Sequence, residues 1–300
     1  MGGTRRAVRE DARSEAAVKP DRTACITLLT DYGLEAGFVG ALHAVAFGLA
    51  PSAAVIDLDH SVPRGEVRVG AWRLEHLTRL VPGGVHVAVV DPGVGSSRLP
   101  IALRAGGRLF VGPDNGVLIW AAEAGGGIEE AVVLDDETYF LPDRARTFDG
   151  RDVFVPVACR LAEGATVADV GSAIDPLDLV RLERPAARRL LDGSLETEVV
   201  QVDGFGNVQL GASQADLGAL GLSAGDQFAV ESGRERVVAT AGSTFSDVGP
   251  GEAVLLLDSD GQLALARNGG RADALLPAAL GGRVLVRRVG PSPADAGRPT

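Results

Sequence analysis

The chain has 300 residues, 46% of them hydrophobic, which is enough for one large domain or two smaller ones. Its formal net charge of −11 argues against a nucleic-acid surface, because such a surface needs clustered cations that displace counterions from phosphates. We therefore expect no nucleic-acid partner and favour a neutral or cationic small ligand.

Cysteine and histidine patterns exclude two further classes. The two cysteines, Cys25 and Cys159, lie far apart in apolar contexts, so no disulfide framework is expected. The chain has four histidines, and none of the spacings typical of a metal site occurs among them: His43, His60, His76 and His86. The sequence therefore predicts no metal.

No apolar run reaches the roughly 18 residues of a membrane span, so no membrane association is expected. Residues 1–23 carry charges throughout and lack the apolar core of a signal peptide, which predicts a disordered extension and a cytoplasmic location. Residues 291–300, rich in Pro, Ala and Gly, are predicted to be a disordered tail.

Residues 24–185 alternate short β-branched runs with amphipathic stretches, which is typical of an α/β domain. Strands are predicted at 26–30, 54–58 and 85–90, with helices at 38–49 and 67–81 between them. A hairpin at 101–104 and 109–111 and then a short helix follow, and another helical pattern starts near residue 154. We expect a mostly parallel or mixed sheet.

Between residues 181 and 194 the charge density rises and the periodicity fails, which predicts a linker. Short alternating strands then recur at regular spacing through residues 195–290. The predicted fold class is thus an N-terminal α/β domain followed by a C-terminal all-β domain.

The segment from Val89 to Arg98 carries the first candidate site. An apolar strand stops at Asp91, and a Pro-Gly-Val-Gly turn brings the chain to Arg98 seven residues later. The carboxyl ends of strands in open α/β sheets are where ligands bind, so this charged pair is a candidate for chemistry. The alternative is an exposed ion pair on a surface hairpin, and this segment alone leaves the two about equal.

Two more polar segments border apolar elements of this domain. Asp31 follows the first strand and could accept two hydrogen bonds from ribose hydroxyls, or it could cap the next helix. Asp149 lies in Thr-Phe-Asp-Gly-Arg-Asp before a helical pattern, and there the local sequence favours a cap formed by Asp149 or Asp152.

In the C-terminal domain, Asp203-Gly-Phe-Gly-Asn207 joins two predicted strands by a tight turn. An exposed aromatic beside Asn could bind a purine, although a hairpin with Asn207 in a left-handed conformation is simpler. The segments 257–261 and 266–270 repeat the same strand-turn pattern. The residues alone predict a polar pocket without naming its substrate.

Six motifs occur together in a recognisable order: TDYG at Thr30, DPGVG with Arg98, PDNG at Pro113, TFDGRD at Thr147, DGFGN at Asp203 and ARNGG at Ala266. By these motifs the chain resembles the S-adenosylmethionine hydroxide adenosyltransferase (SAM hydrolase) family, related to fluorinase and chlorinase, over residues 24–290. The resemblance implies a barrel-like C-terminal domain. It also implies a homotrimer with sites between subunits and hydrolysis of S-adenosyl-L-methionine (SAM) to adenosine and methionine without a cofactor.

The resemblance assigns catalytic roles to Asp91, Arg98 and Asp149, the last at a position where family hydrolases typically carry His. It assigns substrate binding to a further set of residues: Asp31, Phe148, Gly150, Asp203, Phe205, Asn207, Phe245, Ser259, Arg267, Asn268 and Gly269. Where the halogenases have an arginine for the substrate carboxylate, this chain has Asp260. The residue that would bind the substrate carboxylate is therefore left unassigned.

Asp149 leaves two interpretations open. Two carboxylates near one guanidinium cannot ionise independently, so one could hold a raised pKa suited to a general base. Alternatively the site lacks the imidazole and the protein is a slow enzyme or a nucleoside-binding sensor. Halide transfer is disfavoured, because two carboxylates repel an approaching halide.

Overall fold

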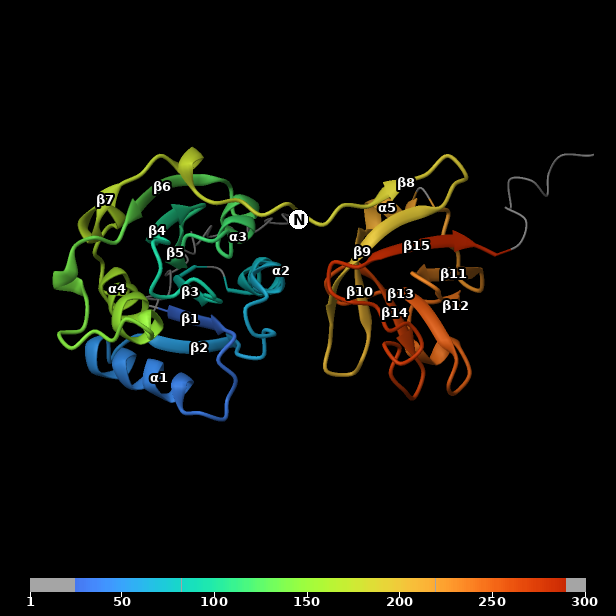
Figure 1. Cartoon of the computed structure of the whole chain (residues 1–300), viewed down its shortest axis with the longest axis horizontal. Coiled ribbons are helices and arrows are strands. Elements are labelled where there is room, and N and C mark those ends of the chain that lie inside the picture. Colours follow the sequence, from blue (N-terminus) through green and yellow to red (C-terminus); the bar gives the residue numbers. More distant parts are fainter. Residues whose placement is uncertain (1–24, 82, 219, 290–300) are drawn as a thin grey trace, which may run out of the picture.

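The computed structural model describes residues 25–81, 83–218 and 220–289, which form two sheets with separate hydrophobic cores (Figure 1). The predicted N-terminal extension and C-terminal tail lie outside the described residues. Within the described part, no helix is long and apolar enough to cross a membrane. The prediction of an α/β domain followed by an all-β domain is confirmed.

The first sheet is mixed and has the strand order β2-β1-β3-β5-β4-β6-β7. The pairings of β1 with β2 and β3, and of β3 with β5, are parallel, whereas β4 runs antiparallel to β5 and β6. The strands are β1 (Cys25–Thr30), β2 (Ala54–Asp59), β3 (Val85–Val89), β4 (Pro100–Ala105), β5 (Arg108–Pro113), β6 (Ile128–Val133) and β7 (Ser172–Ala173).

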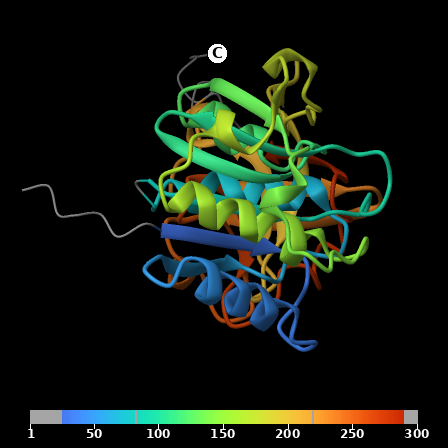
Figure 2. The ribbon, with the colours of Figure 1, turned by 90° about the vertical axis from the view of Figure 1, so that its left-hand side faces the viewer.

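Helices lie on both faces of this sheet (Figure 2). Alternate side chains of each central strand are buried on opposite sides, so Ile26 and Leu28 pack with α1 and α4, whereas Leu29 packs with α2 and α3. The helices are α1 (Phe38–Leu49), α2 (Val67–Thr78), α3 (Ile119–Ala124) and α4 (Val155–Ala162), with a π-helical turn (Gly150–Phe154) before α4 and short 3-10 turns at Glu137–Tyr139, Val167–Val170 and Pro176–Asp178. The predicted second helix is shorter than expected, ending at Thr78 rather than near 81.

The second sheet closes into a seven-stranded barrel, because β9 pairs with β10 as well as with β15. Within the described part of this second sheet, only β12 and β13 pair in parallel. The elements are β8 (Arg188–Arg189), β9 (Leu195–Val202), β10 (Val208–Ser213), α5 (Gln214–Gly218), β11 (Gln227–Ser232), β12 (Glu235–Ala241), a 3-10 turn (Phe245–Asp247), β13 (Ala253–Leu257), β14 (Gln262–Arg267) and β15 (Arg283–Arg288). Strand β8, which pairs with β9, falls inside the segment predicted as linker.

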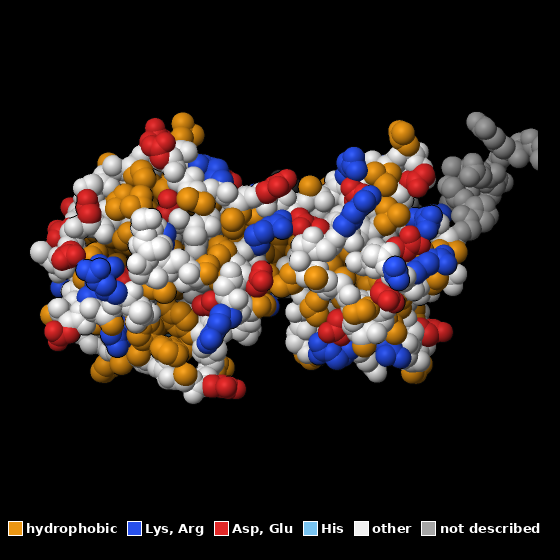
Figure 3. Space-filling view, viewed as in Figure 1, with side chains coloured by type: hydrophobic (Ala, Val, Ile, Leu, Met, Phe, Trp, Pro, Cys, Tyr) orange, Lys and Arg blue, Asp and Glu red, His pale blue; other side chains and the backbone are white. Residues whose placement is uncertain are grey.

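A narrow waist joins the two lobes (Figure 3). Across it, the Arg68 guanidinium of α2 donates to both carboxylate oxygens of Glu198 in β9, at 3.0 and 2.8 Å. Trp72 of α2 and Val200 of β9 are buried in a small apolar cluster beside these contacts. The contacts between the domains therefore run along α2, on the side of the sheet opposite to α1.

Candidate active site

Three charged side chains meet where β3 ends. The Nε of Arg98 donates to both oxygens of Asp91, at 3.1 and 2.9 Å, and its Nη2 donates to Asp149 Oδ2 at 2.5 Å. Only 11%, 5% and 3% of the side chains of Arg98, Asp91 and Asp149 are exposed. The alternative of an exposed ion pair on a surface hairpin is therefore wrong.

Backbone and ring contacts hold this cluster in place. The side-chain amide of Asn115, from the PDNG motif, donates to the Val90 carbonyl at 2.8 Å and so fixes the end of the strand. The Arg98 guanidinium carbon lies 5.3 Å from the centre of the Phe154 ring. Although burial alone would lower the pKa of Arg98, its hydrogen bonds to Asp91 and Asp149 raise it above its usual value, so this group is a permanent cation.

Asp149 precedes the π-helical turn, but its side chain makes no capping hydrogen bond. Its Oδ1 instead accepts hydrogen bonds from Arg144, 3.2 Å from Nε and 3.0 Å from Nη2. The cap interpretation of Asp149 and Asp152 is thus wrong: Asp152 is fully buried and accepts from the backbone N–H of Ala145 at 2.7 Å. Sequence reasoning missed Arg144, although it lies only five residues before Asp149 in the same segment.

Asp31 and an aromatic group lie beside the cluster. Asp31 Oδ2 accepts from the backbone N–H of Gly65 at 2.8 Å, and α1 begins after Gly37, so Asp31 does not cap this helix. Asp31 also lines a hollow together with Tyr32 and Phe38. Its predicted role toward a ribose stays compatible with this position.

Tyr32 lies between that hollow and the charged cluster. Its ring packs edge-on against Phe148, with ring centres 5.6 Å apart. A Cβ atom on Gly150 would lie 2.4 Å from the Tyr32 hydroxyl oxygen, so the glycine makes room for this ring. Burial, followed by the charges of Asp31, Asp91 and Asp149, raises the pKa of Tyr32, and the phenol stays protonated beside the three carboxylates.

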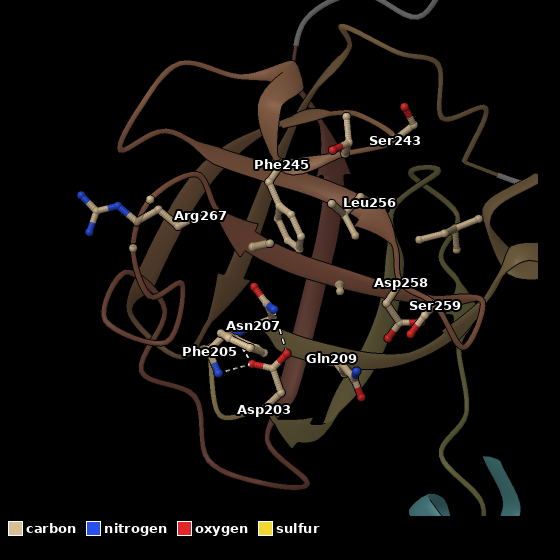
Figure 4. A pocket seen from close by; sticks show the side chains of 16 residues that line it. Asp203, Phe205, Asn207, Gln209, Ser243, Phe245, Leu256, Asp258, Ser259 and Arg267 are labelled. Carbon is tan, nitrogen blue, oxygen red and sulfur yellow. Dashed lines mark hydrogen bonds between the residues drawn. The ribbon is translucent and has the colours of Figure 1, made fainter. Parts of the chain in front are cut away.

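A second hollow, of about 700 Å³, lies on the barrel (Figure 4). Phe205 and Phe245 stand on opposite sides of it, with 82% and 48% of their surfaces exposed. Six other residues assigned to the substrate or to the turns around it line the same space: Asp203, Asn207, Asp258, Ser259, Arg267 and Gly269. The structure thus brings together most of the residues predicted in this domain, and it adds Gln209, which sequence reasoning missed.

The turn at Asp203 differs in detail from its prediction. Asp203 accepts hydrogen bonds from the backbone N–H groups of Phe205 and Asn207, each at 2.9 Å, and from the Asn207 side chain at 2.7 Å. The left-handed residue is Gly206, with φ of 85°, and Asn207 has negative φ, so the expected left-handed Asn is wrong. The turn leaves the exposed Phe205 ring at the edge of the hollow.

Two further residues show how the hollow is bordered. The Asn268 side-chain amide donates to the Val248 carbonyl at 2.7 Å, and its backbone N–H donates to the Glu252 carbonyl. Asn268 is not among the residues that line the hollow. Asp258 accepts from the backbone N–H groups of Asp260 and Gln262, each at 2.9 Å, and burial raises its pKa. The lining therefore carries two carboxylates and one guanidinium, a balance suited to a cationic ligand.

Across the described residues, no group of three or more His, Cys, Asp or Glu side chains is placed to hold a metal ion.

Comparison with known proteins identifies this architecture. The model of the SAM hydroxide adenosyltransferase N-terminal domain matches residues 26–171, and that of the C-terminal domain matches residues 197–285. The chain belongs to the SAM hydroxide adenosyltransferase family. The resemblance inferred from the six motifs is therefore confirmed.

Individual members of this family and related structures agree in length and fold. A protein of Salinispora tropica named (R)-S-adenosyl-L-methionine hydrolase is 49% identical over 264 residues, covering 88% of this chain and 98% of its own length. A fluorinase of Nocardia brasiliensis is a more distant relative, 27% identical over 82% of this chain and 91% of its own. A crystal structure of an uncharacterized conserved protein from Thermotoga maritima matches with a TM-score of 0.80 and 33% identity, over 87% of this chain and 99% of that one.

Proposed function

We propose that this protein hydrolyses S-adenosyl-L-methionine to adenosine and L-methionine. The observation that carries the proposal is the buried cluster of Asp91, Arg98 and Asp149 at the end of β3, in a chain of this family. The relative that is 49% identical is named a hydrolase of this substrate, and it aligns along nearly its whole length. The hollow on the barrel, with exposed aromatic rings and an excess of carboxylates, suits a cationic nucleoside.

The proposed reaction is a direct displacement at ribose C5′. A water molecule held by Asp91 and Arg98 forms the new C5′–O bond, while the C5′–S bond breaks and its electron pair returns to sulfur. The sulfonium becomes the neutral thioether of methionine, and the proton lost by the water passes to Asp91 and then to solvent. Orientation of this water supplies much of the rate, and Arg98 stabilises its developing hydroxide character.

Substrate binding would use both hollows. In the N-terminal domain, Asp31 accepts hydrogen bonds from the ribose hydroxyls and Phe148 and Gly150 border the sugar. In the barrel, Phe205, Asn207 and Phe245 contact adenine, and Asp203 and Ser259 bind the amino-acid group. Arg267 and the backbone of Asn268 and Gly269 complete this wall. Because Asn268 already bonds to Val248 and Glu252, Arg267 and Gly269 are better placed than Asn268 to contact the substrate.

We further propose a homotrimer in which the N-terminal hollow of one subunit faces the barrel hollow of its neighbour. The exposed Phe205 ring supports this arrangement, since a large aromatic side chain that is 82% exposed is well placed to be covered by a ligand and a second surface. An equimolar mixture of Asp91→Asn and Asp203→Asn proteins, unfolded and refolded together, should regain activity. If each site were built within one subunit, the mixture would stay as inactive as its parts.

The direct test follows the products. Purified protein is incubated with each sulfonium epimer of SAM, with and without chloride, and adenosine, methionine and any 5′-chloro nucleoside are separated by chromatography. Equal amounts of adenosine and methionine, with no chlorinated product, are expected, and preference for the (R) epimer would match the relative's name. Binding of SAM with no turnover would instead favour a sensor, the alternative raised by Asp149.

A further inference from the structure

Asp149 is held between two guanidinium groups. Its Oδ2 accepts from Arg98 at 2.5 Å, and its Oδ1 accepts from Arg144 at 3.2 and 3.0 Å. Because Arg98 also binds Asp91, the four side chains form an alternating row of carboxylates and guanidiniums with no net charge. Without Arg144 the same cluster would contain two buried carboxylates and one cation.

The position of Arg144 is built into the fold. Asp152 accepts from the backbone N–H of Ala145 at 2.7 Å, and its own carbonyl accepts from the N–H of Leu141 at 2.9 Å, so the loop that carries Arg144 is tied to the π-helical turn. The Arg144 guanidinium carbon also lies 5.2 Å from the centre of the Phe140 ring. One third of the Arg144 side chain is exposed, in a polar hollow on the side of the cluster formed by this loop.

We propose that Arg144 is a positioning residue for the hydrolysis, which holds the Asp149 carboxylate in place and directs its Oδ2 at Arg98. The inference rests on the proposed function. In this arrangement Asp149 acts as a fixed negative charge that orients Arg98 and, through it, the attacking water. The groups facing Asp149 are Arg98, Arg144, Asp91 and Tyr32, and the two guanidiniums among them each bind one oxygen of its carboxylate.

Family hydrolases typically carry His where this chain has Asp149, which by itself would suggest that histidine is tolerated there. An imidazole placed between Arg98 and Arg144 would instead leave both guanidiniums without their carboxylate, and its cationic form would be repelled by both. Histidine at this position should therefore function only when Arg144 is replaced as well.

The test is a double-mutant cycle of Arg144→Gln and Asp149→His, with Arg146→Gln as matched control. Arg146 borders the same hollow, and among the described residues it makes no ion pair with the cluster. Arg144→Gln should lower kcat at least tenfold with KM changed less than threefold, because substrate still binds while Arg98 and the water are misdirected. Arg144→Lys should recover part of the loss, and Arg146→Gln should stay within twofold of wild type.

In the cycle, Asp149→His should lose more than tenfold in kcat on its own and regain most of it with Arg144→Gln. Additive losses would overturn the proposal, as would an Arg144→Gln variant with wild-type kcat. Failure of the proposed function itself would appear separately, as a wild-type protein that releases no adenosine. In that case a double-mutant cycle of thermal stability decides: the losses in Arg144→Gln and Asp149→Asn should be non-additive, whereas those in Arg146→Gln and Asp149→Asn should add, and additive losses in both pairs would overturn the proposal.

Discussion

The molecule has two candidate half-sites, the charged cluster at the end of β3 and the hollow on the barrel. They differ in how complete each one is within a single chain. The cluster at the end of β3 is buried and internally neutralised, because each carboxylate already has a guanidinium partner. The hollow on the barrel is open, and its two phenylalanines are largely exposed. Under the proposed function, the reacting groups would be held in place before substrate binds, whereas the barrel hollow would be completed by the substrate and by a neighbouring subunit.

Removing Arg98 should have the largest effect. We expect Arg98→Met to lower kcat about 10²–10³-fold, because the developing hydroxide loses its main cation. The free energy of unfolding should fall by about 3 kcal/mol, since Asp91 is left buried without a partner. Single-turnover kinetics and urea denaturation measure the two effects.

The double variant Arg98→Met with Asp91→Asn separates these two consequences. It removes the uncompensated charge, so stability should largely return while activity stays lost. An Arg98→Met enzyme that keeps its kcat within threefold would contradict the role of the preorganised half-site.

Phe205 tests the open half-site. Replacement by Ala should weaken binding of SAM and of adenosine about tenfold, because a base stacked on an aromatic side chain contributes about 1–3 kcal/mol. The barrel itself should stay folded, since the ring is 82% exposed within the chain. Calorimetric titration checks the affinity, and Phe47→Ala, which removes another exposed ring on α1, is the control. Equal affinities of all three proteins would show that the hollow does not bind the base.

Gly150 tests how tightly the cluster is packed. A Cβ atom there would lie 2.4 Å from the Tyr32 hydroxyl, so Gly150→Ala should cost about 1–3 kcal/mol of stability and lower kcat. Addition of Tyr32→Phe removes the clashing oxygen and should recover most of the stability, as judged by thermal unfolding. Gly40 of α1 has open space around it, and there Ala should be neutral or slightly stabilising. If Gly150→Ala lost no stability, the Tyr32 hydroxyl would not be packed tightly against Gly150.

The smallest effect is expected at Asp258, in the open half-site. Burial raises its pKa in the folded protein, so the folded state binds a proton more tightly than the unfolded state, and stability falls as pH rises through the interval between the two values. Asp258→Asn keeps an acceptor for the N–H groups of Asp260 and Gln262 and removes this penalty. It should gain about 0.5 kcal/mol at pH 7 and nothing below the pKa of the unfolded chain, as shown by unfolding at both pH values. A gain of equal size at both would contradict this origin.

Local sequence predicted the fold class well, because strand and helix periodicity reflects which side chains face the core. The strands around Ile26, Val55 and Val87 and the helix at Phe38 appear as expected. Errors arose where backbone geometry depends on neighbours: the second helix ends earlier, and β8 pairs inside the segment predicted as linker. Propensity does not determine such details when tertiary pairing competes with it.

The sequence by itself determined the family, the two-domain order and the polar residues that follow the strands, because these depend on motifs and on short-range periodicity. Only the tertiary structure decided how the charges pair. It showed that Asp149 binds Arg98 and Arg144 instead of capping a helix, and that Gly206 rather than Asn207 takes the left-handed conformation. Side chains 51 residues apart in the chain, such as Arg98 and Asp149, form an ion pair only when the sheet and the π-helical turn bring them together, and no local pattern encodes that distance.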